Sequence, residues 1–311
     1  MALEIRQLHR HPDFTGHFVG EVLGVDLTKP LSPDEAAAIE AGMDKYGVLV
    51  FHGQDITDEQ QIEFSKNFGD LELPDNKSNI IKEHQRRVRR EIADVSNLGR
   101  DNQPLDRMDR RRFFNFGNQL WHSDSSFRVV PAKYSLLSAR SVVDRGGDTL
   151  FADMRAAFDA LEDWQQEEVD GLICEHSLMY SRGILGFDEL TEDEKANFKP
   201  VRQSLVREHP LTGRKSLYLS AHAGAVVGWP MPEARSLLRD LNEHATGDRF
   251  VYTHKWRLHD LVMWDNRQTM HRVRRFPNDT TARRDMRRTT LTSGVQTALQ
   301  EGQTPESVAA E

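Results

Sequence analysis

The stretch AKYSLLSARSVVDRGGDTLFA, residues 132–152, decides the fold class because it is typical of two β-strands joined by a turn. The segments 132–143 and 148–152 are rich in apolar and β-branched residues, and Gly146 and Gly147 separate them. Further candidates follow at short intervals, with strands at 206–211, 215–220, 249–256 and 260–266 and helices at 154–172 and 232–245. The sequence therefore predicts a mainly β protein with helical insertions, built as a β-sandwich or jelly roll.

Two helix starts and one buried strand precede this β region. Ser32-Pro33-Asp34-Glu35 combines an N-cap, a proline in the first turn and a capping-box Glu, which predicts a helix to about Tyr46. GVLVFHG, residues 47–53, predicts a buried strand. Thr57-Asp58-Glu59-Gln60 is a second capping box, and it predicts a helix that ends near Gly69.

Residues 74–119 differ from the rest of the chain because they are polar, rich in arginine and poor in periodicity. Arginines cluster around Arg87 and again around Arg111, and IADVSNL, residues 92–98, is a short strand candidate. One interpretation is a long solvated loop, and the other is a lid-like insertion over a site that binds anions. The segment 295–311, after Gly294, is polar, and we predict a disordered tail behind a single domain of residues 1–294.

Composition excludes several classes of protein. The 311 residues are 38% hydrophobic and 29% charged, as in soluble globular proteins, and the formal net charge of -8 argues against nucleic acid as a partner. No run of about 18 apolar residues is present, so we expect no membrane span. The N-terminal MALEIRQLHRHPDF does not resemble a secretory signal. Cys174 is the only cysteine, which excludes an intrachain disulfide, and a cytoplasmic protein is the default expectation.

A candidate metal centre lies in QLWHSD, residues 119–124. On a strand, His122 and Asp124 would point to the same face and could offer a nitrogen and an oxygen to one ion. His271 is the best third ligand, because it follows the apolar segment DLVMWDNRQTM and is predicted at a strand end. Two histidines and one carboxylate are the facial triad of Fe(II) oxygenases. An isolated His-X-Asp pair is weak evidence, since a structural pair is commoner.

An arginine-rich strand candidate, ARRDMRRTT, follows the third proposed ligand. Arg284, Met286 and Arg288 would share one face, which could direct two cations into a barrel. An arginine matches a carboxylate with two parallel hydrogen bonds, as the far carboxylate of 2-oxoglutarate would require. Thr149 is a candidate hydroxyl partner for that carboxylate. The alternative is an exposed basic edge strand.

Together these segments resemble the taurine/2,4-dichlorophenoxyacetate dioxygenase family, from about Gly20 to about Thr292. The order and spacing of four separate motifs carry the resemblance, and the 2,4-dichlorophenoxyacetate branch is the most similar. The motifs are the iron-binding signature FGNQLWHSDSSF (116–127), the threonine segment GGDTLFADMRAAFDAL (146–161), the distal-histidine segment FVYTHKWRLHDLVMWDNRQTMHRVRRF (250–276) and the arginine strand ARRDMRRTT (282–290).

The resemblance implies a double-stranded β-helix, a jelly-roll variant, and roles for individual residues. His122, Asp124 and His271 would bind Fe(II), and Arg288 would bind the anionic head of the main substrate. Thr149 and Arg284 would bind the far carboxylate of 2-oxoglutarate, and Asn118 would also contact this co-substrate. The other co-substrate would be O2, and ascorbate would sustain activity. We further expect a homo-oligomer that binds neither nucleic acid nor membrane.

The substrate implied by the resemblance is a small carboxylate, with an aryloxyalkanoate such as 2,4-dichlorophenoxyacetate as the first choice. In the taurine branch a histidine follows the FG(D/E)L segment and helps to hold a sulfonate, whereas this sequence has Glu72 there. Alternatives are the same chemistry on an alkyl sulfate, a sulfonate or an N-acyl amino acid. A non-catalytic jelly-roll binding protein is the alternative from another class.

Other residues near these motifs have competing interpretations. For His209, His222 and His254 a hydrogen-bonded core or surface role is favoured over metal binding. Trp121 and Trp264 are expected to pack the wall of the site. Asp265 or Asn266 could orient His271 or simply form a turn, and Phe127 and Met286 could line a substrate pocket or pack in the core.

Overall fold

A long mixed sheet forms one side of the molecule in the computed structural model, which describes residues 2–9, 16–74, 83–305 and 307. Its strand order is β1-β2-β3-β13-β5-β15-β4, with β2 and β3 parallel and all other neighbours antiparallel. The strands are β1 (Glu4–His9), β2 (Val19–Leu23), β3 (Val48–Phe51), β4 (Ala93–Asp94), β5 (Ala132–Ser141), β13 (Leu261–Asp265) and β15 (Asp285–Thr292).

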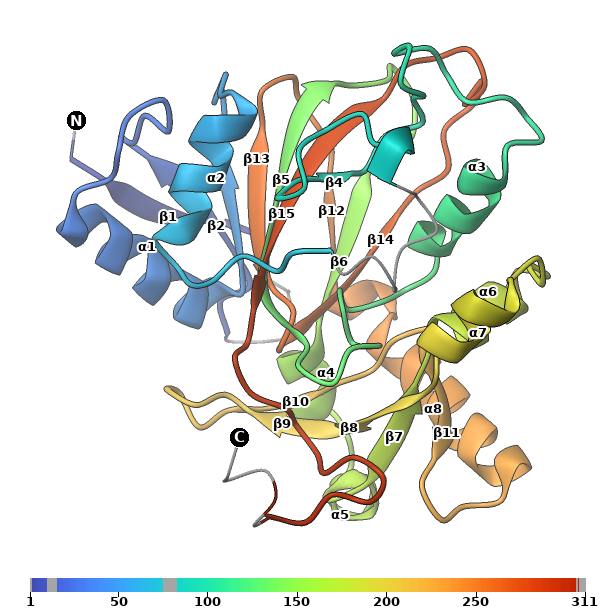
Figure 1. Cartoon of the computed structure of the whole chain (residues 1–311). Coiled ribbons are helices and arrows are strands. Elements are labelled where there is room, and N and C mark those ends of the chain that lie inside the picture. The colour runs from blue at the N-terminus through green and yellow to red at the C-terminus, as the bar shows by residue number, and fades with distance from the viewer. Residues whose placement is uncertain (1, 10–15, 75–82, 306, 308–311) are drawn as a thin grey trace.

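A second, three-stranded sheet packs beside β5, β13 and β15 (Figure 1). It consists of β6 (Thr149–Asp153) between β12 (Val251–His254) and β14 (Thr269–Val273). Phe151 of β6 lies against Trp264 of β13, with ring centres 5.5 Å apart, and Met286 of β15 is fully buried in the same cluster. The structure is therefore mainly β, as predicted.

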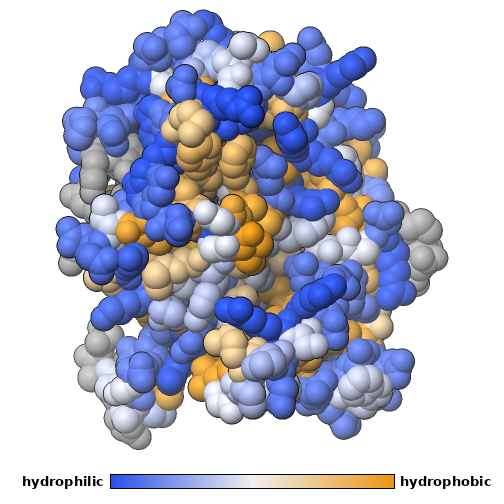
Figure 2. Space-filling model, turned by 90° about the vertical axis from the view of Figure 1, so that its right-hand side faces the viewer, coloured by the Kyte–Doolittle hydropathy of each residue, from blue (hydrophilic) through white to orange (hydrophobic). Residues whose placement is uncertain are grey.

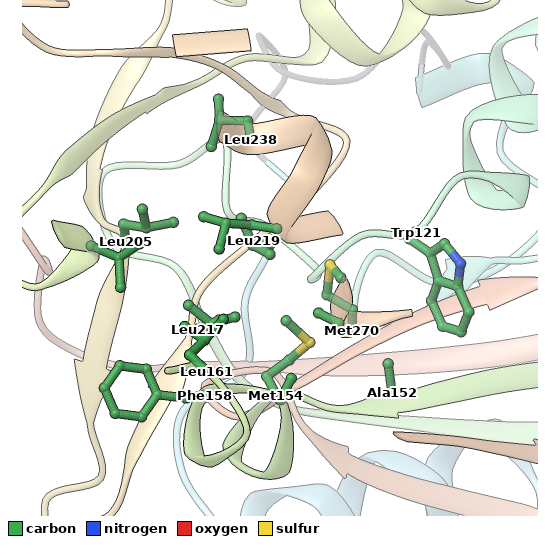
Figure 3. Close-up of a cluster of buried hydrophobic side chains, with 14 of the residues drawn as sticks. Trp121, Ala152, Met154, Phe158, Leu161, Leu205, Leu217, Leu219, Leu238 and Met270 are labelled. Carbon is green, nitrogen blue, oxygen red and sulfur yellow. The ribbon is translucent and has the colours of Figure 1, made fainter. Parts of the chain in front are cut away.

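The remaining strands and several helices form the lower part of the molecule as drawn in Figure 1. They are β7 (Ile173–His176), β8 (Val201–Ser204) and β11 (Ala223–Val226) in one sheet, and β9 (Val206–Glu208) with β10 (Lys215–Leu217) in a hairpin. Figure 3 shows the apolar cluster beneath them, where Leu217, Leu219 and Leu238 lie near Met154 and Met270. This cluster joins α8 (Met231–Ala245) to β6 and β14.

Both predicted capping boxes are present. In α1 (Pro33–Tyr46) the Ser32 hydroxyl accepts from the Glu35 N–H, and in α2 (Asp58–Lys66) Thr57 and Gln60 form the same arrangement. The other helices are α3 (Arg110–Asn115), α4 (Met154–Asp159), α5 (Asp163–Val169), α6 (Leu178–Ile184) and α7 (Glu192–Asn197), with the short 3-10 turns η1 (Glu83–Gln85), η2 (Phe116–Gln119) and η3 (Asp248–Phe250).

The single helix predicted over 154–172 is wrong, since the structure has α4 and α5 there. Asp153 caps α4 as expected, but the chain leaves the helix at Ala160 and buries Leu161. Glu162 and Gln165 then form a new capping box that begins α5. A local capping motif therefore outweighed the continuous helical pattern.

The first part of the predicted tail makes hydrogen bonds to β8. The Ser204 N–H of β8 donates to the Thr297 hydroxyl at 3.1 Å, and the Arg202 N–H donates to Gln300 at 2.9 Å. Polar side chains of this segment therefore satisfy backbone N–H groups at the free edge of β8. The final residues, 308–311, lie outside the described part of the chain.

The arginine-rich segment is held against the long sheet through β4, which pairs with β15. Arg87 is nearly buried, and it donates to Asp94 of β4 and Asp285 of β15 at 2.7 Å each. Burial opposes the charge, but the hydrogen bonds to these two carboxylates raise the pKa of Arg87 above its usual value. The short strand expected within 92–98 is confirmed, and residues 75–82 lie outside the described residues.

In the part of the chain that the structure describes, no helix is both long and apolar enough to span a membrane. Figure 2 shows the face on the right of Figure 1, where apolar groups gather in the middle and polar groups surround them.

Candidate iron and 2-oxoglutarate site

The two proposed histidine ligands meet through a backbone bridge. The His122 N–H donates to the His271 carbonyl at 3.0 Å, and the His271 N–H donates back at 2.8 Å. The secondary structure of both residues differs in detail from the prediction. His122 lies in this isolated bridge rather than in a regular strand, and His271 is the central residue of β14 rather than a residue at a strand end. The chain turns at Asp124, and Ser125 has a φ of 55°.

All three predicted ligands are buried and lie together. Their candidate ligand atoms are within 4.8 Å of one another, and this is the one such group among the described residues. The Asp124 carboxylate lies 3.9 Å from His122 Nε2 and 3.7 Å from His271 Nε2. The fold therefore brings together residues that are far apart in the sequence.

Neighbouring groups fix the orientation of these ligands. His122 Nδ1 lies 2.7 Å from the Leu120 carbonyl, which can only accept, so Nδ1 carries the hydrogen and Nε2 remains available. The Ser135 hydroxyl donates to Asp124 at 2.8 Å and accepts from Asn266 at 2.9 Å. Asn266 also accepts a hydrogen bond from the Asp124 N–H. It therefore orients Asp124, whereas the sequence suggested that it could orient His271.

The protonation states suit metal binding. Burial is the main cause that lowers the pKa of both His122 and His271, so both rings are neutral near pH 7. Burial opposes ionisation of Asp124, but the charge of Arg288, together with the hydrogen bond from Ser135, helps to hold its pKa at about 2. Neutral imidazoles and an ionised carboxylate are the forms that bind a metal. Two nitrogens and one carboxylate on one side of an ion fit Fe(II) and leave positions for other ligands.

Arg284 and Asn118 line a small cavity of about 80 Å³. Arg284 is buried, and its guanidinium donates to the carbonyls of Gly147 at 3.1 Å and Val95 at 3.5 Å. Burial lowers the pKa of Arg284 to about 10. A buried cation that meets backbone carbonyls is suited to a carboxylate from outside the chain, as the co-substrate would provide.

Asn118 lines both the small cavity and the larger one beside the metal ligands, so it lies where the two meet. Thr149 is buried at the start of β6, and its hydroxyl accepts from Trp256 Nε1 at 2.9 Å. Thr149 does not line either cavity, although Gly147, two residues before it, packs against Arg284. Trp256 was missed from the sequence, because a tryptophan at a strand end carries no distinctive pattern.

Arg288 lines the larger cavity, of about 230 Å³, together with His122 and Asp124. Its guanidinium donates to Asp124, and its Nε is buried without a hydrogen-bond partner among the described residues. Residues of the arginine-rich segment, including Arg87 and Val95, form one wall of this cavity. The predicted inward face of the arginine strand is confirmed, since Arg284 and Arg288 line the two cavities and Met286 is buried, whereas Asp285 on the other face pairs with the nearly buried Arg87.

The aromatic residues divide between the site and the core. Trp264 packs on His271, with ring centres 4.7 Å apart, whereas Trp121 lies in the lower cluster shown in Figure 3. Phe127 lines the larger cavity, and Met286 is ordinary core.

The three histidines weighed as further candidates have hydrogen-bonding roles, as favoured from the sequence. His209 lies against Asp265 and Arg267, and His254 contacts Asp260 at 3.1 Å. His222 contacts the Ser181 hydroxyl at 3.0 Å and also lines the larger cavity. Arg182 lines the same cavity from α6. The sequence does not identify His222 or Arg182 as lining the cavity, because neither residue falls in a motif.

Comparison with known proteins agrees with this geometry. A sequence model described as the taurine catabolism dioxygenase TauD, TfdA family matches residues 4–290. The alpha-ketoglutarate-dependent 2,4-dichlorophenoxyacetate dioxygenase of Burkholderia sp. (strain RASC) is 47% identical over 276 residues, which are 88% of this chain and 91% of that protein. The (S)-phenoxypropionate/alpha-ketoglutarate-dioxygenase of Sphingobium herbicidovorans is 37% identical and covers 80% of this chain and 83% of its own length.

A solved structure extends the likeness to three dimensions. The crystal structure of AAD-2 in complex with Mn(II) and N-oxalylglycine superposes with a TM-score of 0.90 at 59% identity. The match covers 96% of this chain and 100% of that one.

The fold and the site together define a 2-oxoglutarate-dependent non-haem iron dioxygenase, which uses Fe(II), 2-oxoglutarate and O2. More particularly, the chain belongs to the TauD, TfdA family. The resemblance found from four sequence motifs is confirmed.

Proposed function

We propose that this dioxygenase hydroxylates an aryloxyalkanoate, with 2,4-dichlorophenoxyacetate as the leading candidate. The supporting observation is the cavity beside His122 and Asp124, which combines the cation of Arg288 with the aromatic side chains of Phe114 and Phe127. A cation and an apolar wall are what a carboxylate on an aromatic ether requires. The names of the relatives at 47% and 37% identity point to the same substrate class.

In the proposed site, His122, Asp124 and His271 hold the Fe(II). The metal and 2-oxoglutarate, when bound, would supply the O2 chemistry, in which one oxygen atom enters a C–H bond of the substrate and the other enters succinate as 2-oxoglutarate loses CO2. Arg284, Thr149 and Asn118 bind the 2-oxoglutarate, and the burial of Arg284 keeps water from its carboxylate partner.

Arg288 has the positioning role for the main substrate. It holds the substrate carboxylate so that the adjacent carbon faces the metal, which supplies much of the rate through orientation. Hydroxylation of that carbon, which also bears the ether oxygen, produces a hemiacetal. The hemiacetal separates into a phenol and glyoxylate, so the products balance as phenol, glyoxylate, succinate and CO2.

Turnover with a substrate panel tests this proposal. The purified enzyme with Fe(II), ascorbate and 2-oxoglutarate is given aryloxyacetates, alkyl sulfates, sulfonates and N-acyl amino acids in turn. We expect succinate and phenol in equal amounts with the aryloxyacetates, and faster turnover than with the other classes. Faster turnover of an alkyl sulfate would assign the alternative substrate, and no succinate with any compound would support a binding protein.

The wider assignments are part of the same proposal. The facing sheets around β6 and β13 are proposed as a double-stranded β-helix within one domain of residues 1–294, and the described part of 74–119 is proposed as a lid. Cys174, the only cysteine, is a buried free thiol, which agrees with a cytoplasmic protein. The homo-oligomer stays a prediction that sedimentation would check.

A further inference from the structure

A second arginine lines the substrate cavity from α6 rather than from the arginine strand. Arg182 lies on α6, is only 5% exposed and lines the cavity with His122 and Arg288. Its guanidinium lies over the Phe114 ring of α3, 4.2 Å from the ring centre. A Cβ placed at Gly117 would be 2.3 Å from the guanidinium, so the absence of a side chain there makes room for it.

The charge of Arg182 is not compensated within the described part of the protein. Nη1 donates to the Ser181 hydroxyl at 2.9 Å, but Nε is buried without a hydrogen-bond partner among the described residues. Burial lowers the pKa of Arg182 to about 10, and no neighbouring carboxylate opposes that effect. Burying an unpaired cation is costly, which indicates that a negative group completes this site.

Two other nearly buried arginines, Arg155 and Arg87, show the contrast. Arg155 is paired with Asp153 at 2.9 Å, and Arg87 with two aspartates. Arg288 donates to Asp124 and lies near the buried carboxylate of Glu72. An anion that enters the cavity therefore meets a partly compensated cation at Arg288 and an uncompensated one at Arg182.

The surroundings of Arg182 restrict the kind of anion. Phe114, Phe127, Leu178 and His222 line the same part of the cavity, so the partner is a carboxylate attached to an apolar or aromatic body. Phe127 and His222 pack edge to face, with ring centres 5.0 Å apart.

We propose that Arg182 is a second substrate-binding residue, which holds the carboxylate of the aryloxyalkanoate from the α6 side while Arg288 holds it from β15. The inference rests on the proposed function and deepens it, because it assigns selectivity for acids to a residue outside the family-like motifs. Arg182 contributes to binding the main substrate and not to binding iron or 2-oxoglutarate.

The test measures substrate binding without turnover. Wild type, Arg182→Met and Arg182→Lys are loaded with Mn(II) and N-oxalylglycine and titrated calorimetrically with 2,4-dichlorophenoxyacetate or its neutral primary amide. Arg207→Met is the matched control, because Arg207 is also partly buried, lies over the Tyr218 ring at 4.7 Å and does not line the cavity.

We expect Arg182→Met to weaken acid binding by about 10- to 100-fold, the range for loss of a hydrogen bond to a charged group. Amide binding should change by less than about twofold, and Arg182→Lys should fall between wild type and Arg182→Met. Arg207→Met should match wild type. Substrate-independent conversion of 2-oxoglutarate to succinate should keep its KM in every variant.

Three results would overturn the assignment. Acid binding by Arg182→Met equal to wild type would do so, and so would an equal loss for acid and amide, which indicates a packing role. If Arg182→Met does not fold, unchanged acid binding by Arg182→Lys would have the same meaning. These results leave the proposed function standing. If the wild-type protein binds no aryloxyacetate at all, the proposed substrate class is wrong and the Arg182 assignment is lost with it.

Discussion

The metal side and the substrate side of the cavity are built in different ways. The ligands and their partners lie on or beside β5, β13, β14 and β15, where backbone ladders and buried hydrogen bonds fix each side chain. The rest of the cavity lining comes from the arginine-rich segment and α6, where short elements are held by ion pairs such as Arg87 with Asp285. Rigid strands hold the metal ligands in one fixed geometry. A wall of short elements can differ between related enzymes and so adapt the cavity to different substrates.

The largest expected effect comes from the metal side, through His271→Ala. Removing one of three ligands should weaken metal binding by more than about 100-fold, beyond the range for residues that only support a ligand. Titration with Mn(II) or Fe(II) and succinate release measure it. His244→Ala is the control, since His244 lies on α8 and contacts the Ala157 carbonyl. Unchanged metal affinity in His271→Ala would exclude His271 as a ligand.

A smaller effect on the same side should follow from Ser135→Ala. Ser135 donates to Asp124 and accepts from Asn266, so its loss frees the carboxylate to rotate. Metal affinity should fall by about 10-fold. Ser138→Ala is the matched control, because Ser138 is also buried on β5 but donates to Gln61. If both variants bind metal equally well, the hydrogen bond to Asp124 has no orienting role.

The same contrast explains what the sequence could predict. His122, Asp124 and the arginine strand have short, fixed spacings, because strand geometry sets which residues share a face. Asn266 donates to Ser135, which in turn donates to Asp124. Ser135 and Asn266 are more than a hundred residues apart in the chain, so no local sequence pattern encodes their contact. Arg182 lies on a seven-residue helix with no motif, so its place in the cavity depends on how α6 packs against α3. The break after α4 was missed because Glu162 begins a new helix inside a continuous helical pattern.

The smallest expected effect on catalysis concerns the substrate side, through Arg87→Met. This change leaves Asp94 and Asp285 without their shared cation, so the free energy of unfolding should fall by about 3 kcal/mol. The KM for the main substrate should rise by roughly threefold as the wall loosens, while metal affinity stays the same. Urea denaturation and steady-state kinetics measure these effects.

Arg89→Met is the control for that prediction, because Arg89 forms an exposed ion pair with Glu59 that should contribute less than about 1 kcal/mol. Equal stability of Arg87→Met and wild type would mean that this ion-pair network does not hold the wall in place.

The division of labour between Arg284 and Arg288 tests the central claim most directly. Arg284→Ala and Arg288→Ala are compared by measuring the KM for 2-oxoglutarate and for 2,4-dichlorophenoxyacetate in each variant, with bound iron checked in both. We predict that Arg284→Ala raises mainly the 2-oxoglutarate KM, by about 100-fold, as expected for loss of a buried charge partner. Arg288→Ala should raise mainly the KM for the aryloxy acid. Equal changes of both KM values in both variants would contradict the account.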